Sequence, residues 1–387
     1  MEPLEGARPA PLVEPAPELT PAAAARARRQ IVLPGFGEEA QRRLAAARVL
    51  VIGAGGLGCA AVPYLAGAGI GRIGIVDDDA VELSNLHRQV AHTTADLGRA
   101  KVDSLAETAL AIDPGLTIDR HRARLTAENA LALFAEYDLV IDGSDNFPTR
   151  YLANDAAQLT GIPLVWGAIL QFSGQLGVAW HAHGPGYRDL FPQPPAADTV
   201  LDCAEGGVLP GLCGTVGSLL ATEALKLITG VGDPLIGRVL LYDALAARTR
   251  ELRINRDPLA EPVTELIDYA LFCGVAASED PAAGAMPLAG AELVERIRAG
   301  AAPRLVDVRS AEERAERRLR NSEWVPLERI VSGDTALSGP VTIYCERDPR
   351  SVRAAEALAA RGTVDVSFLR GGIHEFARLA PDLIERG

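Results

Sequence analysis

The stretch RVLVIGAGGLG, residues 48–58, decides the fold. Its first half is apolar and rich in β-branched residues, so it predicts a buried strand. Its second half is a glycine-rich turn that opens a helix, where backbone N–H groups can receive phosphate oxygens. Gly53, Gly55, Gly56 and Gly58 are therefore candidate nucleotide-binding residues. The alternative is that these glycines only allow the helix to pack closely on the sheet.

Strands and helices alternate from residue 48 to about residue 145. This alternation predicts the α/β class, with a doubly wound, largely parallel sheet that binds ligands at the carboxyl ends of its strands. Residues 162–180 predict an antiparallel extension of that sheet, and residues 181–195, rich in Gly and Pro, a long surface loop. A helix at 215–229 and a closing strand at 238–244 complete this part.

Composition divides the chain into four segments. Residues 1–25, rich in Pro and Ala, predict a disordered tail without the cationic start of a signal peptide. The first domain then covers residues 26–275, and residues 276–287 are the expected linker. Residues 288–387 predict a smaller α/β domain, with helices at 289–299 and 351–361 and strands at 304–308, 341–345 and 364–369.

The chain has 387 residues and a formal net charge of −13. This charge argues against nucleic acid and anionic membranes as partners, because both need basic surface. The uncharged stretch 49–71 is interrupted by glycines and Pro63, so it does not predict a membrane span. Five widely spaced cysteines do not form a disulfide framework, so we expect a cytoplasmic protein.

Polar residues follow the expected strands at the ligand-binding edge. Asp77 comes directly after the second strand, where a carboxylate accepts hydrogen bonds from ribose hydroxyls; Asp78 and Asp79 compete for this role. Lys101 begins a helix after the motif SNLHRQ, which holds two further candidates, Asn85 and Arg88. The arginine and the lysine supply two cations for the phosphate charge of ATP.

The motif Ser144-Asp145-Asn146 follows the fourth expected strand. Asp145 is placed to hold a magnesium ion that bridges phosphate oxygens. The alternative is that Asp145 is the N-cap of the next helix. A dehydrogenase that binds NAD fits the glycine turn and Asp77, but it leaves Arg88, Lys101 and Asp145 without a role.

Several motifs carry a resemblance to known families. Those of the first domain resemble the ubiquitin-activating-type adenylyltransferases, whose bacterial members include MoeB and ThiF. They are RQIVLPGFG (29–37), GAGGLG (53–58), VDDD (76–79), SNLHRQ (84–89), Lys101 and SDN (144–146). Those of the second domain resemble a rhodanese, and the combination resembles the two-domain proteins of the MoeZ type. The motifs of the second domain are LVDVR (305–309), YCERDPRS (344–351) and FLRGGIHEFA (368–377).

This resemblance implies an ATP-dependent adenylyltransferase that activates the C-terminal Gly-Gly carboxylate of a small ubiquitin-like sulfur-carrier protein. It assigns Asp77 to the ribose and Asn85, Arg88 and Lys101 to the phosphates. It assigns magnesium to Asp145, with Asn146 beside it. Arg29 matches an arginine that reaches into the neighbouring subunit's site, which implies a homodimer. Cys203 matches a cysteine that links covalently to the carrier or takes part in sulfur transfer; the alternative is a buried small hydrophobe.

In the rhodanese-like segment, Cys345 would carry a persulfide, received from a donor such as a cysteine desulfurase or thiosulfate. Arg350 and loop N–H groups lower the pKa of such a thiol, whereas Glu346 and Asp348 raise it and Pro349 removes one N–H. The product would be a thiocarboxylate for molybdenum cofactor, thiamine or cysteine synthesis or for tRNA thiolation. A second hypothesis makes this domain a non-catalytic docking module.

This chain departs from the family pattern at a structural metal site. Many relatives bind zinc through two C-x-x-C pairs. Residues 186–189 read Gly-Tyr-Arg-Asp and residues 260–263 contain no cysteine, so zinc is not expected.

Overall fold

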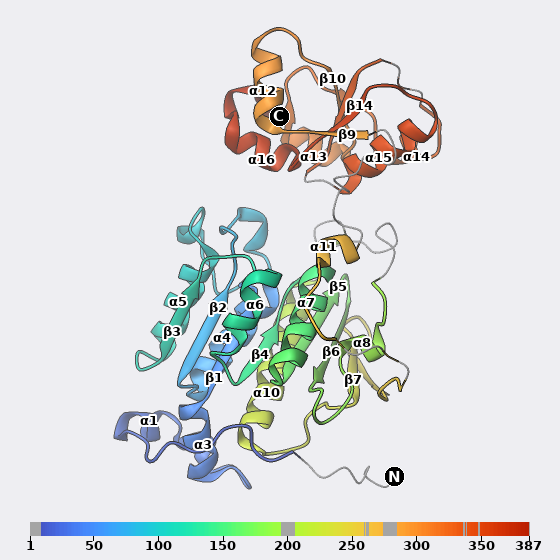
Figure 1. The fold of residues 1–387 in the computed structure, drawn as a ribbon. Coiled ribbons are helices and arrows are strands. Elements are labelled where there is room, and N and C mark those ends of the chain that lie inside the picture. The colour runs from blue at the N-terminus through green and yellow to red at the C-terminus, as the bar shows by residue number, and fades with distance from the viewer. Residues whose placement is uncertain are drawn as a thin grey trace. The chain divides into compact units, whose positions relative to one another are not determined.

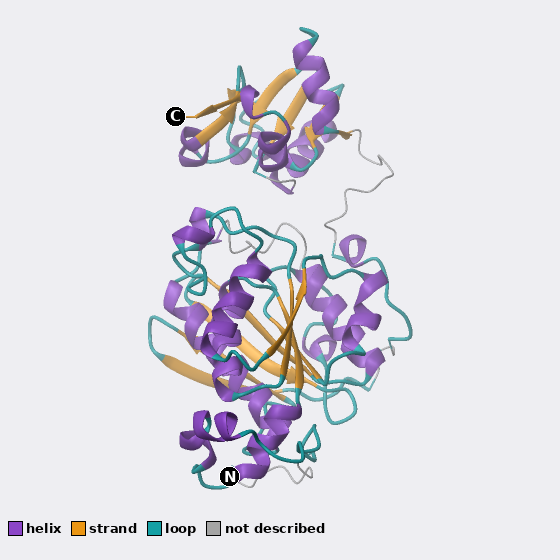
Figure 2. Cartoon of the chain, turned by 90° about the vertical axis from the view of Figure 1, so that its left-hand side faces the viewer, coloured by secondary structure: helices purple, strands orange, loops and turns teal. Residues whose placement is uncertain are grey.

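The chain folds into two α/β units, Met1–Cys273 and Gly274–Gly387, each with its own sheet (Figures 1 and 2). The computed structural model describes residues 9–194, 206–258, 260, 263–273, 285–335, 337, 339–346 and 349–386. Each unit is considered by itself below.

The first unit is built on an eight-stranded sheet in the order β3-β2-β1-β4-β5-β6-β7-β8. The first five of these strands run parallel and the rest antiparallel, which confirms the predicted sheet with its antiparallel extension. The parallel strands are β3 (Thr117–His121), β2 (Arg72–Val76), β1 (Arg48–Ile52), β4 (Leu139–Asp142) and β5 (Leu164–Leu170). The antiparallel ones are β6 (Ser173–Ala179), β7 (Arg238–Asp243) and β8 (Arg248–Arg253).

Helices cover both faces of this sheet (Figures 1 and 2). Alternate side chains of β1 serve the two layers: Val49 and Val51 pack into one core, Leu50 and Ile52 into the other. The first layer holds α3 (Gly37–Ala46), α4 (Gly56–Ala68), α5 (Lys101–Ile112) and α10 (Pro210–Thr229). The second holds α6 (Ala127–Phe134), α7 (Phe147–Thr160), α8 (Tyr187–Leu190) and α11 (Tyr269–Phe272).

Helix α10 is long and apolar enough to cross a membrane by length and composition alone. It packs instead against α4 so closely that a Cβ atom on Gly217 would lie 2.7 Å from the carbonyl oxygen of Leu57. Side chains such as Val216 and Leu220 are fully buried in the first core. The helix is therefore a core element. It begins at Pro210, five residues before the predicted start, because proline is well suited to the first turn.

The N-terminal segment corrects the prediction of a disordered tail. From Pro9 onward it is ordered: helix α1 (Pro21–Arg26) leads into α2 (Arg28–Ile31). Before α1, the Leu12 N–H donates to the Leu227 carbonyl at 3.0 Å. Arg43 donates to the carbonyl of Val13 at 2.5 Å. These hydrogen bonds fix the segment against the first unit, and the composition of the segment does not reveal them. Residues 1–8 lie outside the described part of the chain.

The second unit has a five-stranded parallel sheet in the order β12-β10-β13-β14-β9. These strands are β12 (Glu323–Trp324), β10 (Arg304–Asp307), β13 (Val341–Tyr344), β14 (Val366–Leu369) and β9 (Ala285–Leu288). Strands β11 (Arg317–Leu319) and β15 (Ile384–Arg386) form a separate antiparallel pair. The helices are α12 (Gly290–Arg298), α13 (Ala311–Glu316), α14 (Leu327–Val331), α15 (Pro349–Ala360) and α16 (Gly372–Leu379).

The expected linker, residues 276–287, is only partly tested. Residues 276–284 lie outside the described residues. Residues 285–287 belong to β9, which pairs with β14 at the edge of the second sheet, so the linker prediction is wrong for these three positions. A four-residue edge strand that contains a proline, Pro287, gives little sequence signal.

The turn between β1 and α4 requires glycine at two positions. Gly53 leaves the strand with a φ of +88°, a conformation that favours glycine. A Cβ atom on Gly58 would overlap the carbonyl oxygen of Gly53. The glycines are thus required both for the turn and for the approach of helix to strand.

We expect Gly58→Ala to lower the free energy of unfolding by about 2–3 kcal/mol, because the added methyl group displaces the backbone. Urea denaturation of the full chain measures this. The control is Gly214→Ala in α10, where a Cβ atom meets nothing within 4 Å. That control should gain up to about 1 kcal/mol from helix propensity. Equal stability of the two variants would contradict the packing argument.

Candidate functional site

The carboxyl ends of β1 and β2 bring Asp77 to the glycine-rich turn. One carboxylate oxygen accepts the N–H of Ala54 at 2.8 Å, and the other accepts the N–H of Asp79 at 2.8 Å. Burial raises the pKa of Asp77, while the Lys101 ammonium and these two N–H groups oppose the rise. A carboxylate has further lone pairs beyond the two used here, so Asp77 can still accept hydrogen bonds from a ligand.

The three successive aspartates have different partners. Asp78 pairs with Arg124 at 3.2 Å, and Asp79 pairs with the Lys101 ammonium at 2.8 Å. Asp77 is therefore the one that faces the turn. The three carboxylates also form a group close enough to hold a cation, among the residues that the structure describes.

Lys101 is the buried cation of this edge, with 6% of its surface exposed. Burial by itself lowers the pKa of Lys101, but the carboxylates of Asp77, Asp79 and Asp145 outweigh burial and raise it. The ammonium group therefore stays charged at the start of α5. A buried, charged lysine surrounded by carboxylates is ready to exchange one of them for a phosphate oxygen.

The SNLHRQ segment lies on the other side of the turn. The Asn85 side chain accepts the N–H of Glu82 at 3.1 Å, which fixes the short helix η1 (Leu83–Asn85). The Cγ atom of Arg88 lies 3.9 Å from where a Cβ atom on Gly56 would stand. Gln89 approaches Gly55 in the same way at 3.7 Å.

Gln89 is a residue that our sequence reasoning missed. It is 3% exposed, and its side-chain oxygen is buried with no hydrogen-bond partner among the described residues. The signal was present, since Gln89 ends the motif that contains Asn85 and Arg88. Its side chain is a neutral amide, so a pattern of charged residues such as Arg88 and Lys101 does not include it.

The turn between β4 and α7 carries Asp145. The N-cap of α7 is Asn146, whose side-chain oxygen accepts the N–H of Thr149 at 3.0 Å. The capping role considered for Asp145 is thus filled by its neighbour, and Asp145 stays exposed. A Cβ atom on Gly143 would lie 3.3 Å from the Gly58 nitrogen, so this turn lies directly on the glycine-rich turn.

Arg29 lies far from this site in its own chain. The neighbouring Gln30 donates to the carbonyl of Ala68, the last residue of α4, at 3.1 Å. The glycine-rich turn is at the opposite end of that 13-residue helix, about 20 Å away. Arg29 is exposed at this far end, so it cannot complete the site of its own chain.

The cysteines of the first unit differ in position. Cys203 lies outside the described residues. Cys213 is 1% exposed and covers the glycine-rich turn, since its sulfur lies 2.7 Å from where a Cβ atom on Gly56 would stand. Cys59 is fully buried with its sulfur 3.3 Å from His92 Nε2, and burial raises its pKa to about 12. Cys273 is 5% exposed, and burial raises its pKa to about 11.

In the second unit, Cys345 follows β13 at the end of the sheet and is 1% exposed. Its thiol donates to the Ser351 hydroxyl at 3.4 Å, and its carbonyl accepts the N–H of Ile373 at 2.9 Å. Residues 347 and 348 lie outside the described residues. Arg350 forms two hydrogen bonds of 2.8 Å with Glu313. Burial alone raises the pKa of Glu313, but Arg350 outweighs it and lowers the pKa to about 2.

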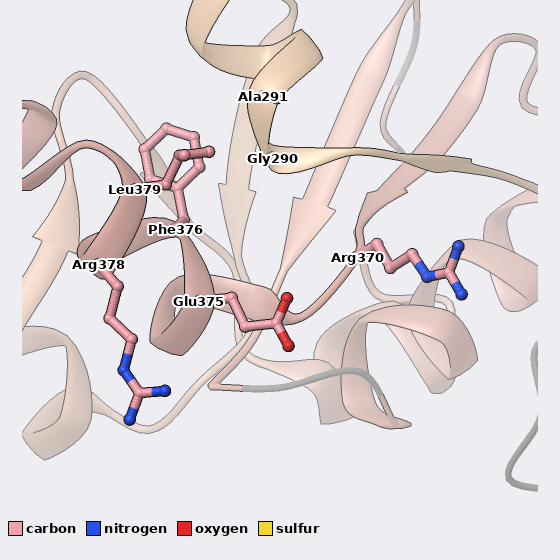
Figure 3. A pocket seen from close by; sticks show the side chains of 7 residues that line it. All are labelled: Gly290, Ala291, Arg370, Glu375, Phe376, Arg378 and Leu379. Atoms are coloured by element: carbon pink, nitrogen blue, oxygen red, sulfur yellow. The ribbon is translucent and has the colours of Figure 1, made fainter.

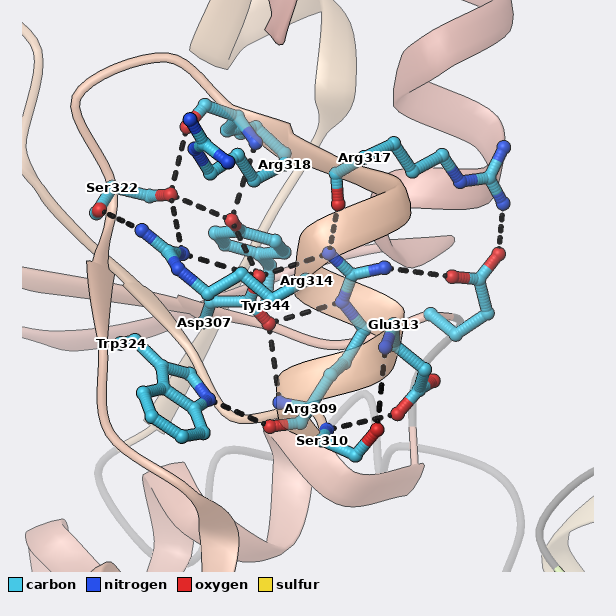
Figure 4. A network of polar contacts seen from close by, with 12 residues as sticks. Asp307, Arg309, Ser310, Glu313, Arg314, Arg317, Arg318, Ser322, Trp324 and Tyr344 are labelled. Atoms are coloured by element: carbon cyan, nitrogen blue, oxygen red, sulfur yellow. Dashed lines mark hydrogen bonds and ion pairs between the residues drawn. The ribbon is translucent and has the colours of Figure 1, made fainter. Parts of the chain in front are cut away.

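Figure 4 shows a polar network around Asp307 and Arg309, and this network extends to Glu346. Arg309, 1% exposed, donates to Asp307 at 3.0 and 2.9 Å and to Glu346 at 3.0 Å. Arg317 also donates to Glu346. The negative charge that we expected to raise the pKa of Cys345 is therefore matched by two guanidinium groups.

A hollow of about 440 Å³ lies between the start of α12 and α16 (Figure 3). Arg370, Glu375 and Arg378 supply its polar lining, and Phe376 and Leu379 its apolar lining. None of the predicted site residues that the structure describes lines this hollow.

Comparison with known proteins agrees with this geometry. The ThiF family matches residues 27–262 and the Rhodanese-like domain matches residues 290–379. The chain is 44% identical over 384 residues to the probable adenylyltransferase/sulfurtransferase MoeZ of Mycobacterium tuberculosis, covering 97% of this chain and 98% of that protein. It is 51% identical over 261 residues to the sulfur carrier protein adenylyltransferase of Thermus thermophilus, covering 65% of this chain and 96% of that one.

Two more distant comparisons extend this picture. The chain is 42% identical over 385 residues to the adenylyltransferase and sulfurtransferase MOCS3 of Anopheles gambiae, covering 92% of this chain and 86% of that protein. Among solved structures, Escherichia coli MccB with MccA-N7isoASN superposes with a TM-score of 0.55 at 19% identity. That overlap covers 62% of this chain and 74% of that one, and it shows a shared fold.

Proposed function

Because this chain belongs to the ThiF family and joins that domain to a rhodanese-like domain, we propose that it adenylates a sulfur-carrier protein and then supplies it with sulfur. The partner is a small ubiquitin-like protein whose C-terminal Gly-Gly carboxylate reacts with ATP. The observation that carries the proposal is the grouping of Asp77, Lys101 and Asp145 around the glycine-rich turn. Relatives named for adenylyl and sulfur transfer support it.

In the adenylation step, a carboxylate oxygen of the carrier attacks the α-phosphorus of ATP. A bond to that phosphorus forms while the bond to pyrophosphate breaks, and no proton needs to move. The N–H groups at the start of α4 receive phosphate oxygens, and Lys101 and Arg88 neutralise the charge on the departing pyrophosphate. Asn85 and Gln89 line the same edge. Asp77 accepts hydrogen bonds from the ribose, so catalysis rests on positioning and charge.

Asp145 is the residue that would hold magnesium. Its carboxylate fits an oxygen-preferring cation because Asn146, and not Asp145, caps α7. When bound, the ion supplies further positive charge for the phosphates. A dehydrogenase would need neither Lys101 nor Asp145, so the alternative of NAD binding has no support from this cluster.

In the sulfur step, the persulfide of Cys345 attacks the acyl-adenylate, and AMP leaves as the new carbon–sulfur bond forms. Reduction of the resulting acyl disulfide by a thiol releases the carrier thiocarboxylate. Cys203 is our candidate for a second reacting thiol, on resemblance alone. The sulfur donor is a cysteine desulfurase or thiosulfate, and this thiol chemistry suits a reducing cytoplasm. The alternative is that the second unit is a non-catalytic docking module. It is favoured by the ion pair between Arg350 and Glu313, because the resemblance places the Arg350 guanidinium beside the thiolate instead.

The active species is a homodimer in this proposal. Arg29 lies at the end of α4 remote from its own glycine-rich turn, so only a second copy places it near a nucleotide. Each site would then be built from two chains.

We expect Asp145→Ala to abolish ATP–pyrophosphate exchange in the presence of a carrier ending in Gly-Gly. The reason is that the phosphates lose the group that holds their counter-ion. Isotope exchange measures the effect, and Asp189→Ala, a change of equal charge in the first unit, is the control. Normal exchange by Asp145→Ala would remove the metal role, and absence of exchange in the unaltered protein would remove the adenylation proposal.

For Cys345→Ser we expect unchanged ATP–pyrophosphate exchange and no thiocarboxylate, since the serine hydroxyl cannot carry a persulfide sulfur. Mass spectrometry of the carrier, incubated with thiosulfate or with a desulfurase and cysteine, reads out the product. A normal thiocarboxylate yield would show instead that the second unit docks a partner.

Mixing Arg29→Ala with Lys101→Ala tests the shared site. Each variant alone should be inactive in exchange, whereas the mixture should recover about a quarter of the activity, because half of the mixed dimers' sites are intact and half of the dimers are mixed. Sedimentation velocity confirms that each variant still assembles. An active Arg29→Ala homodimer would show that this arginine does not serve a second chain.

A further inference from the structure

Two buried charged side chains hold the turn that presents Asp145. Asp142, the last residue of β4, is 0% exposed, and its Oδ1 accepts the N–H of Ser144 at 2.9 Å. Arg150, in the first turn of α7, is 8% exposed and donates from Nη2 to the Ser144 carbonyl at 3.1 Å. Both backbone polar groups of Ser144, the residue before Asp145, are thus fixed by side chains from the two flanking elements.

The opposite side of this turn is fixed by the glycine-rich turn. The N–H of Gly143 donates to the Ile52 carbonyl at 2.9 Å. A Cβ atom on Gly143 would lie 3.2 Å from that oxygen, and one on Gly53 would lie 3.2 Å from the Gly143 carbonyl oxygen. The two turns are in backbone contact, so a shift of Ser144 changes the distance from Asp145 to the phosphate-binding N–H groups.

This arrangement leaves polar atoms without partners. Asp142 Oδ2, Ser144 Oγ and Arg150 Nε are all buried and have no hydrogen-bond partner among the described residues. Burial raises the pKa of Asp142, and the Arg150 guanidinium opposes the rise. Buried charged groups with incomplete hydrogen bonding add little net stability. Such groups are explained better by the geometry that they impose than by the stability that they provide.

We propose that Asp142 and Arg150 are positioning residues that hold the 143–145 turn against the glycine-rich turn, so that Asp145 faces the phosphates of the bound nucleotide. This inference rests on the proposed function and adds to it the residues that set the place of the metal ligand. Both side chains are buried, so in this proposal they act through the turn and not by contact with the nucleotide. They act on the part of nucleotide binding that depends on magnesium, and not on the part carried by Asp77 and the glycines.

The test is Arg150→Lys, which keeps a positive charge beside Asp142 but lacks the planar fork of arginine. Calorimetric titration of the full chain with a non-hydrolysable ATP analogue gives the affinity with and without magnesium. We expect the gain in affinity due to magnesium to fall about tenfold, as for other residues that orient a metal ligand. Affinity without magnesium should change less than about twofold, within ordinary additivity for distant sites.

Arg188→Lys is the matched control. Arg188 is a half-buried arginine that donates to Asp155 of α7 at 2.8 and 2.7 Å, and no hydrogen bond among the described residues joins it to the Asp145 turn. This variant should lose stability and keep the full magnesium effect. If Arg150→Lys does not fold, the nearly isosteric Asp142→Asn decides, with the same expected loss.

Further outcomes separate the two proposals. Combining Arg150→Lys with Asp145→Asn should cost no more of the magnesium effect than Asp145→Asn alone, because both act through one carboxylate. The positioning role is overturned if the folded variant keeps the wild-type magnesium effect, or if Arg188→Lys loses as much. A wild-type chain that does not bind the ATP analogue overturns the proposed function, and the positioning role falls with it.

Discussion

Parallel pairing of three central strands is the constraint on which the first unit's site depends. Ile52 of β1 pairs with Val76 of β2 on one side and with Asp142 of β4 on the other. The next residue of each strand, Gly53, Asp77 and Gly143, therefore leaves the sheet at one level. The glycine-rich turn, the Asp77 carboxylate and the turn at Gly143 therefore lie close together, because the register of the sheet ends the three strands at the same level.

Charges at this edge are balanced locally. Lys101 is buried among carboxylates that keep it protonated, and the Arg150 guanidinium opposes the rise that burial causes in the pKa of Asp142. Charges are also paired locally in the second unit. Arg309 and Arg317 neutralise Glu346. Arg350 neutralises Glu313. In both units some of the charged groups of the candidate sites, such as Lys101 and Arg350, are held in ion pairs, so a ligand would have to exchange partners with them.

The sequence was sufficient to predict those features that depend only on neighbouring residues. The apolar run before GAGGLG predicted β1, and a carboxylate directly after a strand predicted the place of Asp77. It was insufficient where long-range contacts decide. Strand β8 is exposed along its whole length and has no apolar pattern, and the N-terminal segment is ordered by bonds to residues far along the chain. The Arg309–Glu346 pair joins positions 37 residues apart, which no spacing rule connects.

In the part of the chain that the structure describes, strand β8 forms an edge of the eight-stranded sheet, with no further strand paired to it. Unpaired N–H and C=O groups along such an edge invite another strand to add to it. Here Arg248, Arg250 and Arg253 are exposed on a six-residue strand, and Arg238 pairs with the last of them across the ladder. A second copy approaching edge to edge would bring guanidinium against guanidinium. Exposed arginines on an edge strand oppose such pairing by electrostatic repulsion, even in a chain whose overall charge is negative.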